Sequence, residues 1–185
     1  MNDAGLVAAN NNGYSASESH EGVSTCFLQR LVIENAATVE EGIAITRRGP
    51  RSVGTIMLLA GGNPPDAVEM EFDHEAFVAR RAEQGYVIAA NDFRALRCTR
   101  PVGPEERSFG SYGALLGLIR KYHGRIDRTM NFAAARGVPL SFINLHCAVL
   151  FPRDLTFAVS MGKVPAAQGP FRILRMTSGG IVSAE

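Results

Sequence analysis

The strongest constraint on the fold is a stretch in which apolar and acidic side chains alternate without interruption. Apolar residues occupy every second position and acidic residues the positions between them: Val68, Met70 and Phe72 against Glu69, Glu71 and Asp73. Successive side chains of a strand point to opposite faces of a sheet, so this pattern predicts a half-buried β-strand. The turn residues 61–66 and the apolar run 52–60 precede it and complete a predicted hairpin. Glu69 and Glu71 are expected on a solvated face of the sheet. The alternative is that they form a functional carboxylate pair.

Two helical patterns come before this hairpin. Apolar residues spaced three and four apart follow Ser24 and Thr25, either of which can cap a helix: Phe27, Leu28, Leu31 and Val32. Residues 38–41, Thr-Val-Glu-Glu, form a capping box, in which the threonine hydroxyl meets the third amide and the glutamate reaches back. We therefore expect one helix from about residue 25 and a second from Val39 to Gly49.

The second half of the chain predicts a helical block followed by further strands. Apolar residues 112, 115, 116 and 119 indicate one helix, and residues 127–136 a shorter one. Strands are expected at residues 77–80 and 86–90, paired as a hairpin, and at 145–151, 155–160 and 171–176. Strands grouped before and after helices predict an α+β fold with a largely antiparallel sheet. We expect one domain over residues 1–175 and a frayed tail over residues 176–185.

Composition excludes several classes of protein. The 185 residues suffice for one core, and a net charge of +1 argues against nucleic acid or an anionic membrane surface as a partner. Three cysteines leave one unpaired in any disulfide scheme, which favours a reducing compartment. No apolar run approaches the roughly 20 residues of a membrane span, and the N-terminus lacks a signal-peptide pattern. These three features together predict a soluble, cytoplasmic protein. The four histidines show no metal-ligand spacing, so we expect no metal site, and we expect no cofactor.

Asn91 is the residue whose position best suits catalysis. It follows the apolar run Tyr86-Val-Ile-Ala-Ala, which is expected to be a strand, and an arginine-rich loop begins after it. A carboxamide fixed at the end of a strand can donate N–H bonds to one developing negative oxygen, as an oxyanion hole requires. The structural alternative is an asparagine that satisfies the backbone of a turn.

Six short motifs occur in an order typical of one enzyme family. They are Gly5-Leu6 to Asn10-Asn11-Asn12, Gly22-Val23-Ser24-Thr25, Ala37-Thr38-Val39-Glu40-Glu41, Tyr86 to Asn91-Asp92-Phe93, Asn144-Leu145-His146 to Phe151-Pro152, and Pro165-Ala166 to Phe171. In this order, over residues 1 to about 175, the chain resembles the isopenicillin-N acyltransferase family. That family, also described as acyl-coenzyme A:aminopenicillanic-acid acyltransferases, consists of autoproteolytic N-terminal-nucleophile cysteine hydrolases.

The resemblance implies a fold, a reaction and two site residues. The fold is the four-layer αββα sandwich, and the reaction is C–N (amide) hydrolysis or acyl transfer through a cysteine acyl-enzyme. The substrate would be a small-molecule amide or an acyl thioester, with acyl-coenzyme A as a substrate rather than a cofactor. Asn91 inherits the oxyanion role, and Asn11, within the run Asn10–Asn12, assists it.

The chain departs from the family pattern at several positions. The family's nucleophilic Cys-Thr and its Arg-Asn-x-Asp-Trp motif come well before Gly5-Leu6. We therefore expect a sandwich that is incomplete at its N-terminal side and lacks the nucleophile. The chain alone is expected to be inactive. Ser111 stands where the family has an active-site arginine, and Asp92 replaces a histidine, which removes a group that titrates near neutral pH.

Two other interpretations stay open. The chain can be a non-catalytic truncated homologue that acts as a binding or interaction module, in which case exposed sheet edges predict a homodimer. It can also be a fragment without a selected role, which predicts aggregation through the same edges.

The remaining candidate residues have simpler structural interpretations. Cys98 precedes a threonine, as the family nucleophile does, and nearby arginines would favour its thiolate, but a mid-chain cysteine has no free α-amine as base. Cys26 in a first helical turn and Cys147 in an apolar strand are expected to pack as small hydrophobic residues. His146 is expected to bond a neighbour within its strand. The arginines of residues 94–107 either meet a coenzyme A phosphate or form an exposed loop.

Overall fold

Strands β1 to β4 form an antiparallel sheet in the order of the chain. They comprise Val7–Asn12, Thr55–Gly61, Asp66–Phe72 and Phe77–Arg81. The computed structural model describes residues 1–62, 64–97, 111–127 and 144–184, which divide into two units, Met1–Ser108 and Phe109–Glu185. The predicted hairpin is confirmed, because β2 pairs with β3 over the full length of both strands.

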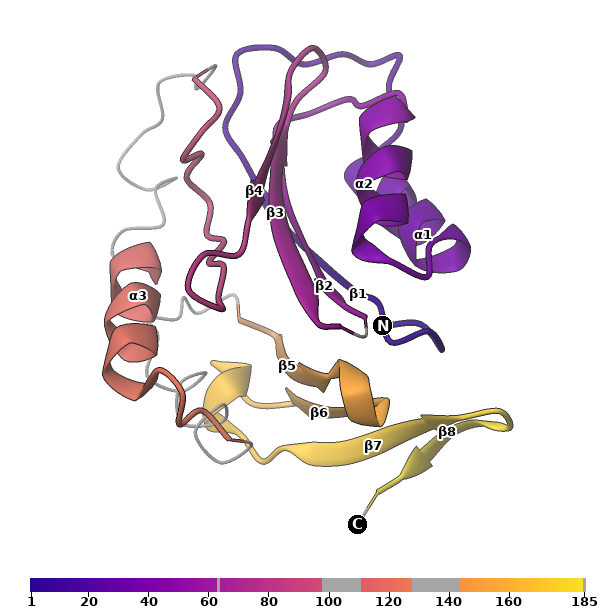
Figure 1. Cartoon of the computed structure of the whole chain (residues 1–185), viewed down its shortest axis with the longest axis vertical. Helices are drawn as coiled ribbons and strands as arrows, with labels where there is room; N and C mark the ends of the chain where they lie inside the picture. The colour runs from indigo at the N-terminus through magenta and orange to yellow at the C-terminus, as the bar shows by residue number, and fades with distance from the viewer. Residues whose placement is uncertain (63, 98–110, 128–143, 185) are drawn as a thin grey trace. The chain divides into compact units, whose positions relative to one another are not determined.

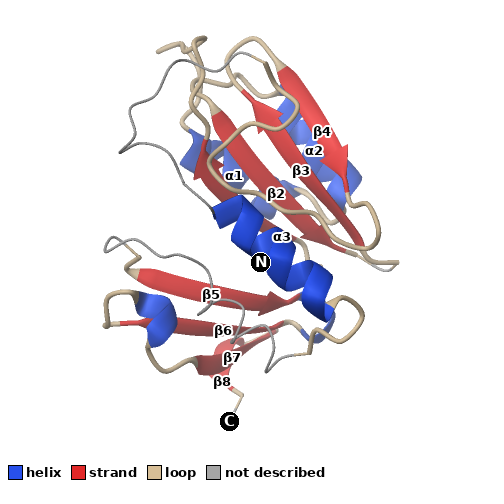
Figure 2. Cartoon of the chain, turned by 90° about the vertical axis from the view of Figure 1, so that its left-hand side faces the viewer, coloured by secondary structure: helices blue, strands red, loops and turns tan. Residues whose placement is uncertain are grey.

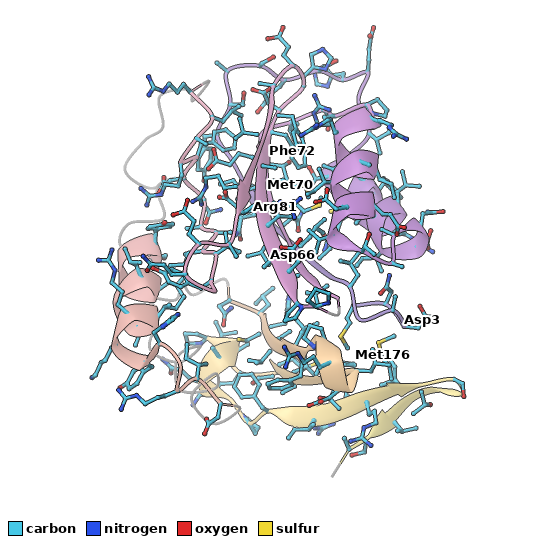
Figure 3. All side chains as sticks on the ribbon, viewed as in Figure 1. Asp3, Asp66, Met70, Phe72, Arg81 and Met176 are labelled. Atoms are coloured by element: carbon cyan, nitrogen blue, oxygen red, sulfur yellow. The ribbon has the colours of Figure 1, made fainter. Side chains whose placement is uncertain are left out.

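Two helices cover one face of this sheet (Figure 1). They are α1, Thr25–Asn35, and α2, Val39–Arg48. Their apolar residues pack on alternate residues of the strands to form the core, which includes Leu28, Val32, Ile43, Met57, Leu59, Val68, Met70 and Phe72. Met70 and Phe72 extend from β3 toward the helices (Figure 3). The apolar half of the alternating stretch therefore faces the core, as its period predicts.

The starts of both helices agree with the sequence. At the start of α2 the Thr38 hydroxyl accepts a bond from the Glu41 amide at 3.2 Å, and the Glu41 carboxylate accepts one from the Thr38 amide at 3.2 Å. This is the predicted capping box. Ser24 is the N-cap residue of α1, although its side chain makes no capping bond.

The acidic half of the alternating stretch is not solvated, and the prediction of a solvated face is wrong. Glu69, Glu71 and Asp73 are each 0% exposed. The chain that follows β4 runs along the side of the sheet away from α1 and α2 (Figure 1), and its amides bond the Glu71 carboxylate. Asp73 accepts bonds from the Ser15 hydroxyl at 2.6 Å and from the amides of Glu75 and Ala76. Alternation shows that two faces differ in polarity, but it does not show that the polar face meets water.

The prediction of a strand at residues 86–90 is also wrong. A single bridge between Glu83 and Tyr86 follows β4, and residues 87–90 belong to no strand. Ile88 and Ala90 are nevertheless buried, so the apolar run packs on the protein without joining a sheet. Arg80 satisfies the Ile88 carbonyl with a side-chain bond of 3.2 Å in place of a ladder bond.

The second unit contains another antiparallel sheet of four strands, in the order β5-β6-β7-β8 (Figure 2). Strands β5, His146–Phe151, and β6, Thr156–Met161, form the predicted hairpin around the short helix η2, Pro152–Asp154. Strand β7 is Arg172–Thr177, and the short helix η3, Ala166–Gln168, lies between β6 and β7. Helix α3, Ser111–Tyr122, confirms the helix predicted from residues 112–119, whereas the helix predicted at 127–136 falls largely outside the described residues.

The C-terminal tail was expected to fray, and this expectation is corrected by strand β8, Gly180–Ser183. It pairs with β7 from Leu174↔Ser183 to Thr177↔Gly180. The turn between them uses Gly180 with a φ of 121°, a backbone conformation that glycine adopts readily. All four residues of β8 are exposed, so backbone pairing rather than burial accounts for this strand.

Two antiparallel sheets with separate helices confirm the α+β fold class. Whether residues 1–175 form a single domain stays a prediction. Across the described ranges, none of the helices has the length and apolar character needed to cross a bilayer.

Candidate functional site

Asn91 lies in a bend directly after the buried residue Ala90. Its side-chain Nδ2 donates a hydrogen bond of 3.1 Å to the main-chain oxygen of Asn12 at the end of β1. The partners are 79 positions apart in sequence. This bond brings together two of the segments that the sequence assigned to one site.

Asn11 lies on the same side of the sheet as the chain around Asn91. In the β1–β2–β3 register Asn11 pairs with Ile56, and Ile56 pairs with Glu71. Directly paired residues share a face, so Asn11 faces away from the helices, with Glu71 two strands further across. Two strand spacings are about 9–10 Å. The side chain of Asn11 is half-buried there.

The segment that carries Asn91, residues 88–96, is called the Asn91 loop below. Arg80 holds its beginning through the 3.2 Å bond from Nη2 to the Ile88 carbonyl. Its middle packs on the residue that follows β1, because the Phe93 ring lies where a side chain on Gly13 would project. A Cβ built on Gly13 would be 2.3 Å from Phe93 Cε1. Glycine at position 13 therefore leaves room for the ring of the Ala90-Asn91-Asp92-Phe93 motif.

Glu71 holds the end of the Asn91 loop. Its carboxylate accepts bonds from three consecutive main-chain amides, those of Arg94, Ala95 at 2.7 Å and Leu96 at 2.6 Å. Successive amides directed at one anion make a concave binding site for negative charge. Here the anion is a buried side chain of the same protein, so the amides fix the loop to β3.

Glu69 and Arg80 complete a buried cluster of charges with Glu71. Arg80 Nε lies 2.6 Å from Glu69 Oε2 and 3.8 Å from Glu71 Oε1. Burial raises the pKa of Glu69, and the negative charge of Glu71 raises it further, while Arg80 opposes both effects. Glu69 Oε1 is buried and has no hydrogen-bond partner among the residues that the structure describes. Two carboxylates thus share one guanidinium, which favours the protonated form of Glu69.

The other candidate residues are placed as follows. Cys26 is exposed on α1, on the opposite side of the sheet from the Asn91 loop. Cys147 is half-buried in β5, and burial raises the pKa of its thiol. His146 is exposed at the start of β5, and Ser111 begins α3. Cys98 and the arginines of residues 100–107 lie outside the described residues, while Arg94 and Arg97 are exposed.

Sequence reasoning missed the residues that hold the Asn91 loop. Glu71 was assigned to solvent and Arg80 to no role. The signal that could have identified Arg80 is the register of β3 and β4, which pairs Glu69 with Arg80. That register becomes visible only when the strands are paired. No group of three or more metal-ligating side chains occurs in the described ranges.

An α+β fold with a fixed side-chain amide beside an edge strand is compatible with a protein that stabilises an oxyanion during acyl transfer. Comparison with known families identifies the class directly. The family described as Acyl-coenzyme A:6-aminopenicillanic acid acyl-transferase matches residues 1–108. The chain belongs to this family, and the matched residues coincide with the first unit. Among curated proteins, none matches the chain significantly.

Proposed function

We propose that the chain contributes the oxyanion-stabilising residues of a site for acyl transfer or for hydrolysis of a C–N (amide) bond. The observation that supports this most directly is the bond from Asn91 Nδ2 to the Asn12 carbonyl. It fixes the Asn91 carboxamide to the main chain of the residue that follows Asn11, and a donor that is fixed before the reaction stabilises developing charge best.

In the proposed reaction a cysteine thiolate adds to the carbonyl carbon of an amide or an acyl thioester, and the carbonyl π electrons move onto oxygen. The Asn91 carboxamide donates a bond to that oxyanion, assisted by Asn11. Collapse of the intermediate releases the amine or the thiol with a proton and leaves the acyl group on sulfur. Water or a second amine then takes up the acyl group.

The source of the thiol is part of the proposal. Cys26 lies across the sheet from the Asn91 loop, so it does not serve this site. We assign the nucleophile to a cysteine that is not among residues 1–185, with Cys98 as the internal alternative. With a nucleophile outside residues 1–185, the 185-residue chain alone is expected to be inactive, whereas Cys98 as the nucleophile would predict activity of this chain.

Acyl-coenzyme A is the proposed acyl donor, because the exposed Arg94 and Arg97 offer charge for its phosphates. The proposed fold of the active form is the four-layer αββα sandwich. The layer of α1 and α2 on the sheet of β1 to β4 supports its first two layers.

Two measurements test this function. The intact mass and N-terminal sequence of the protein from its native source show whether a further segment carries a cysteine. In the native form, Asn91→Ala is expected to lower kcat for thioester or amide turnover by about 10²–10³-fold. Asn35→Ala is the matched control, because the exposed Asn35 also donates from Nδ2 to a main-chain oxygen, that of Leu31 at 2.9 Å. Equal activity of the two variants would refute the role of Asn91.

A second function is that of a non-catalytic binding or interaction module. It is favoured by the position of the Asn12 carbonyl, which accepts the bond from Asn91 at the open edge of the sheet. The amide of Gly13 donates to Gly54, so odd-numbered residues of β1 direct their backbone bonds toward β2. The carbonyls of Ala8 and Asn12 therefore point to the open edge of the sheet. Gln29 Nε2 caps the first at 2.8 Å and Asn91 the second. In this function Asn91 protects a sheet edge against pairing with another chain.

The module would form its homodimer through β8 rather than β1. All four residues of β8 are exposed, and Ile181 and Val182 are 61% and 47% exposed, whereas two carbonyls of β1 are capped. Light scattering on the purified chain tests this assignment. A dimer that Val182→Lys converts to a monomer supports the module, and a wild-type monomer counts against it.

A further inference from the structure

We propose that Glu71 and Arg80 are positioning residues, which fix Asn91 from the face of the sheet that the Asn91 loop covers. The inference rests on the proposed function for its chemical meaning, but its geometry is independent of activity. Both residues act through the main chain of the Asn91 loop.

The first step is that the two residues hold the loop on both sides of Asn91. Arg80 binds the carbonyl of Ile88, three residues before Asn91. Glu71 binds the amides of residues 94–96, three to five residues after it. A segment fixed at both ends at so short a separation leaves its central side chain few alternative positions.

The second step is that Glu71 and Arg80, which anchor the Asn91 loop, interact directly with each other. Arg80 Nε lies 3.8 Å from Glu71 Oε1 and 2.6 Å from Glu69 Oε2. The side chain of Glu71 is 0% exposed, and that of Arg80 is 29% exposed. In this low-dielectric environment a charge-assisted bond is stronger than in water, and loss of either partner leaves a buried charge uncompensated.

The third step concerns why a carboxylate is required at position 71. Three amide donors converge on Glu71, and a carboxylate is an acceptor at both oxygens. Glutamine places an N–H₂ group where one of these oxygens accepts, so at least one amide of the loop loses its partner. Glu71→Gln thus removes the anchor with almost no change in side-chain volume.

The test uses the full chain and hydrogen exchange followed by NMR. Glu71→Gln is expected to speed exchange of the amides of residues 94–96 about tenfold or more, while amides of α2 keep their wild-type rates. The side-chain amide resonances of Asn91 are expected to shift toward those of a free carboxamide. The matched control is Glu75→Gln, because Glu75 is exposed four residues further on. Unchanged exchange at residues 94–96, or an equal increase in α2, would overturn the inference.

If Glu71→Gln does not fold, Arg80→Lys decides the question. Lysine keeps the charge beside the glutamates but loses the planar fork that also reaches Ile88. The Asn91 side-chain resonances are then expected to move while residues 94–96 stay protected, and unmoved resonances would contradict the inference. A native form in which Asn91→Ala keeps full kcat would refute the proposed function alone, since these exchange results do not depend on turnover.

Discussion

Arg80 gives the sharpest stability prediction, because one guanidinium serves two fully buried carboxylates. Arg80→Met keeps much of the side-chain length and removes the charge. Loss of one partner of a buried ion pair typically costs about 3–5 kcal/mol. The side chain of Arg80 is 29% exposed, which places the expected loss toward the lower end of that range, at about 3 kcal/mol at pH 7.

Glu69 can take up a proton when Arg80 is removed, and the cost of this protonation is the most that Glu69 can contribute to the loss of stability. Because that cost depends on pH, the loss of stability in Arg80→Met depends on pH as well. Without Arg80 the folded protein can keep Glu69 neutral, and at pH 7 this costs about 1.36 kcal/mol for each pH unit above the ordinary pKa of 4.5. The limit is therefore about 3.4 kcal/mol at pH 7 and about 0.7 kcal/mol at pH 5. The folded state binds more protons than the unfolded state in this window, so the variant loses stability as the pH rises.

Urea unfolding followed by circular dichroism at pH 5 and pH 7 measures this difference. The control is Arg81→Met. Arg81 pairs with Asp66 at 2.5 Å and with Glu40, but its side chain is 41% exposed. Surface pairs of this kind contribute about 0–1 kcal/mol. A loss below about 1 kcal/mol for Arg80→Met at pH 7, or the same loss at both pH values, would show that the cluster is not a buried charge system.

Three further predictions concern single positions. Glu69→Gln is expected to remove a pH dependence of the free energy of unfolding. Because burial raises the pKa of Glu69, urea titrations should show that wild type loses stability relative to this variant as the pH rises from 4.5. Gly22→Ala is expected to destabilise the protein by about 1–3 kcal/mol in thermal unfolding, because the new Cβ would lie 2.2 Å from the Arg51 carbonyl oxygen. Gly117→Ala in α3 is the control: no described atom lies within 4 Å of the new Cβ, so the protein should become more stable by up to about 1 kcal/mol. Thr38→Ala should cost about 1 kcal/mol in the same assay through loss of its capping bond, and an unchanged midpoint would contradict a role for the capping box.

Local signals predicted the elements whose cause is local. The capping box placed the start of α2 at Val39, because its two hydrogen bonds involve residues three apart. The hairpin of β2 and β3 followed from the turn residues between two apolar patterns. In both cases the interacting groups are neighbours in sequence, so the pattern contains the whole physical cause.

Predictions failed where a distant segment decides the environment. The burial of Glu69 and Glu71 depends on Arg80 from the next strand and on amides from residues 94–96. Alternation of polar and apolar residues is the same for a solvated face and for a face covered by a polar cluster. Residues 86–90 have the composition of a strand, but residues 87–90 lie outside any strand, where the Arg80 side chain donates to the Ile88 carbonyl and the Ile88 side chain is buried.

The placement of Asn91 combines both kinds of information. The order of motifs predicted that Asn91 and Asn11 belong to one site, and the roles of both residues stay predictions. Which groups hold Asn91 was beyond the sequence, because the described groups, those of Asn12, Glu71 and Arg80, belong to other elements of the chain.

All of these anchors lie in the first unit. Asn12, Gly13, Glu71 and Arg80 fix the Asn91 loop from β1, β3 and β4 and the turn after β1. They fall within residues 1–108, which are also the residues that match the acyltransferase family. The family match therefore covers the sheet, the two helices on one of its faces and the described contacts that hold the Asn91 loop on the other. In the proposed function this unit supplies the oxyanion donor, and the nucleophile and the walls of the substrate pocket come from outside it.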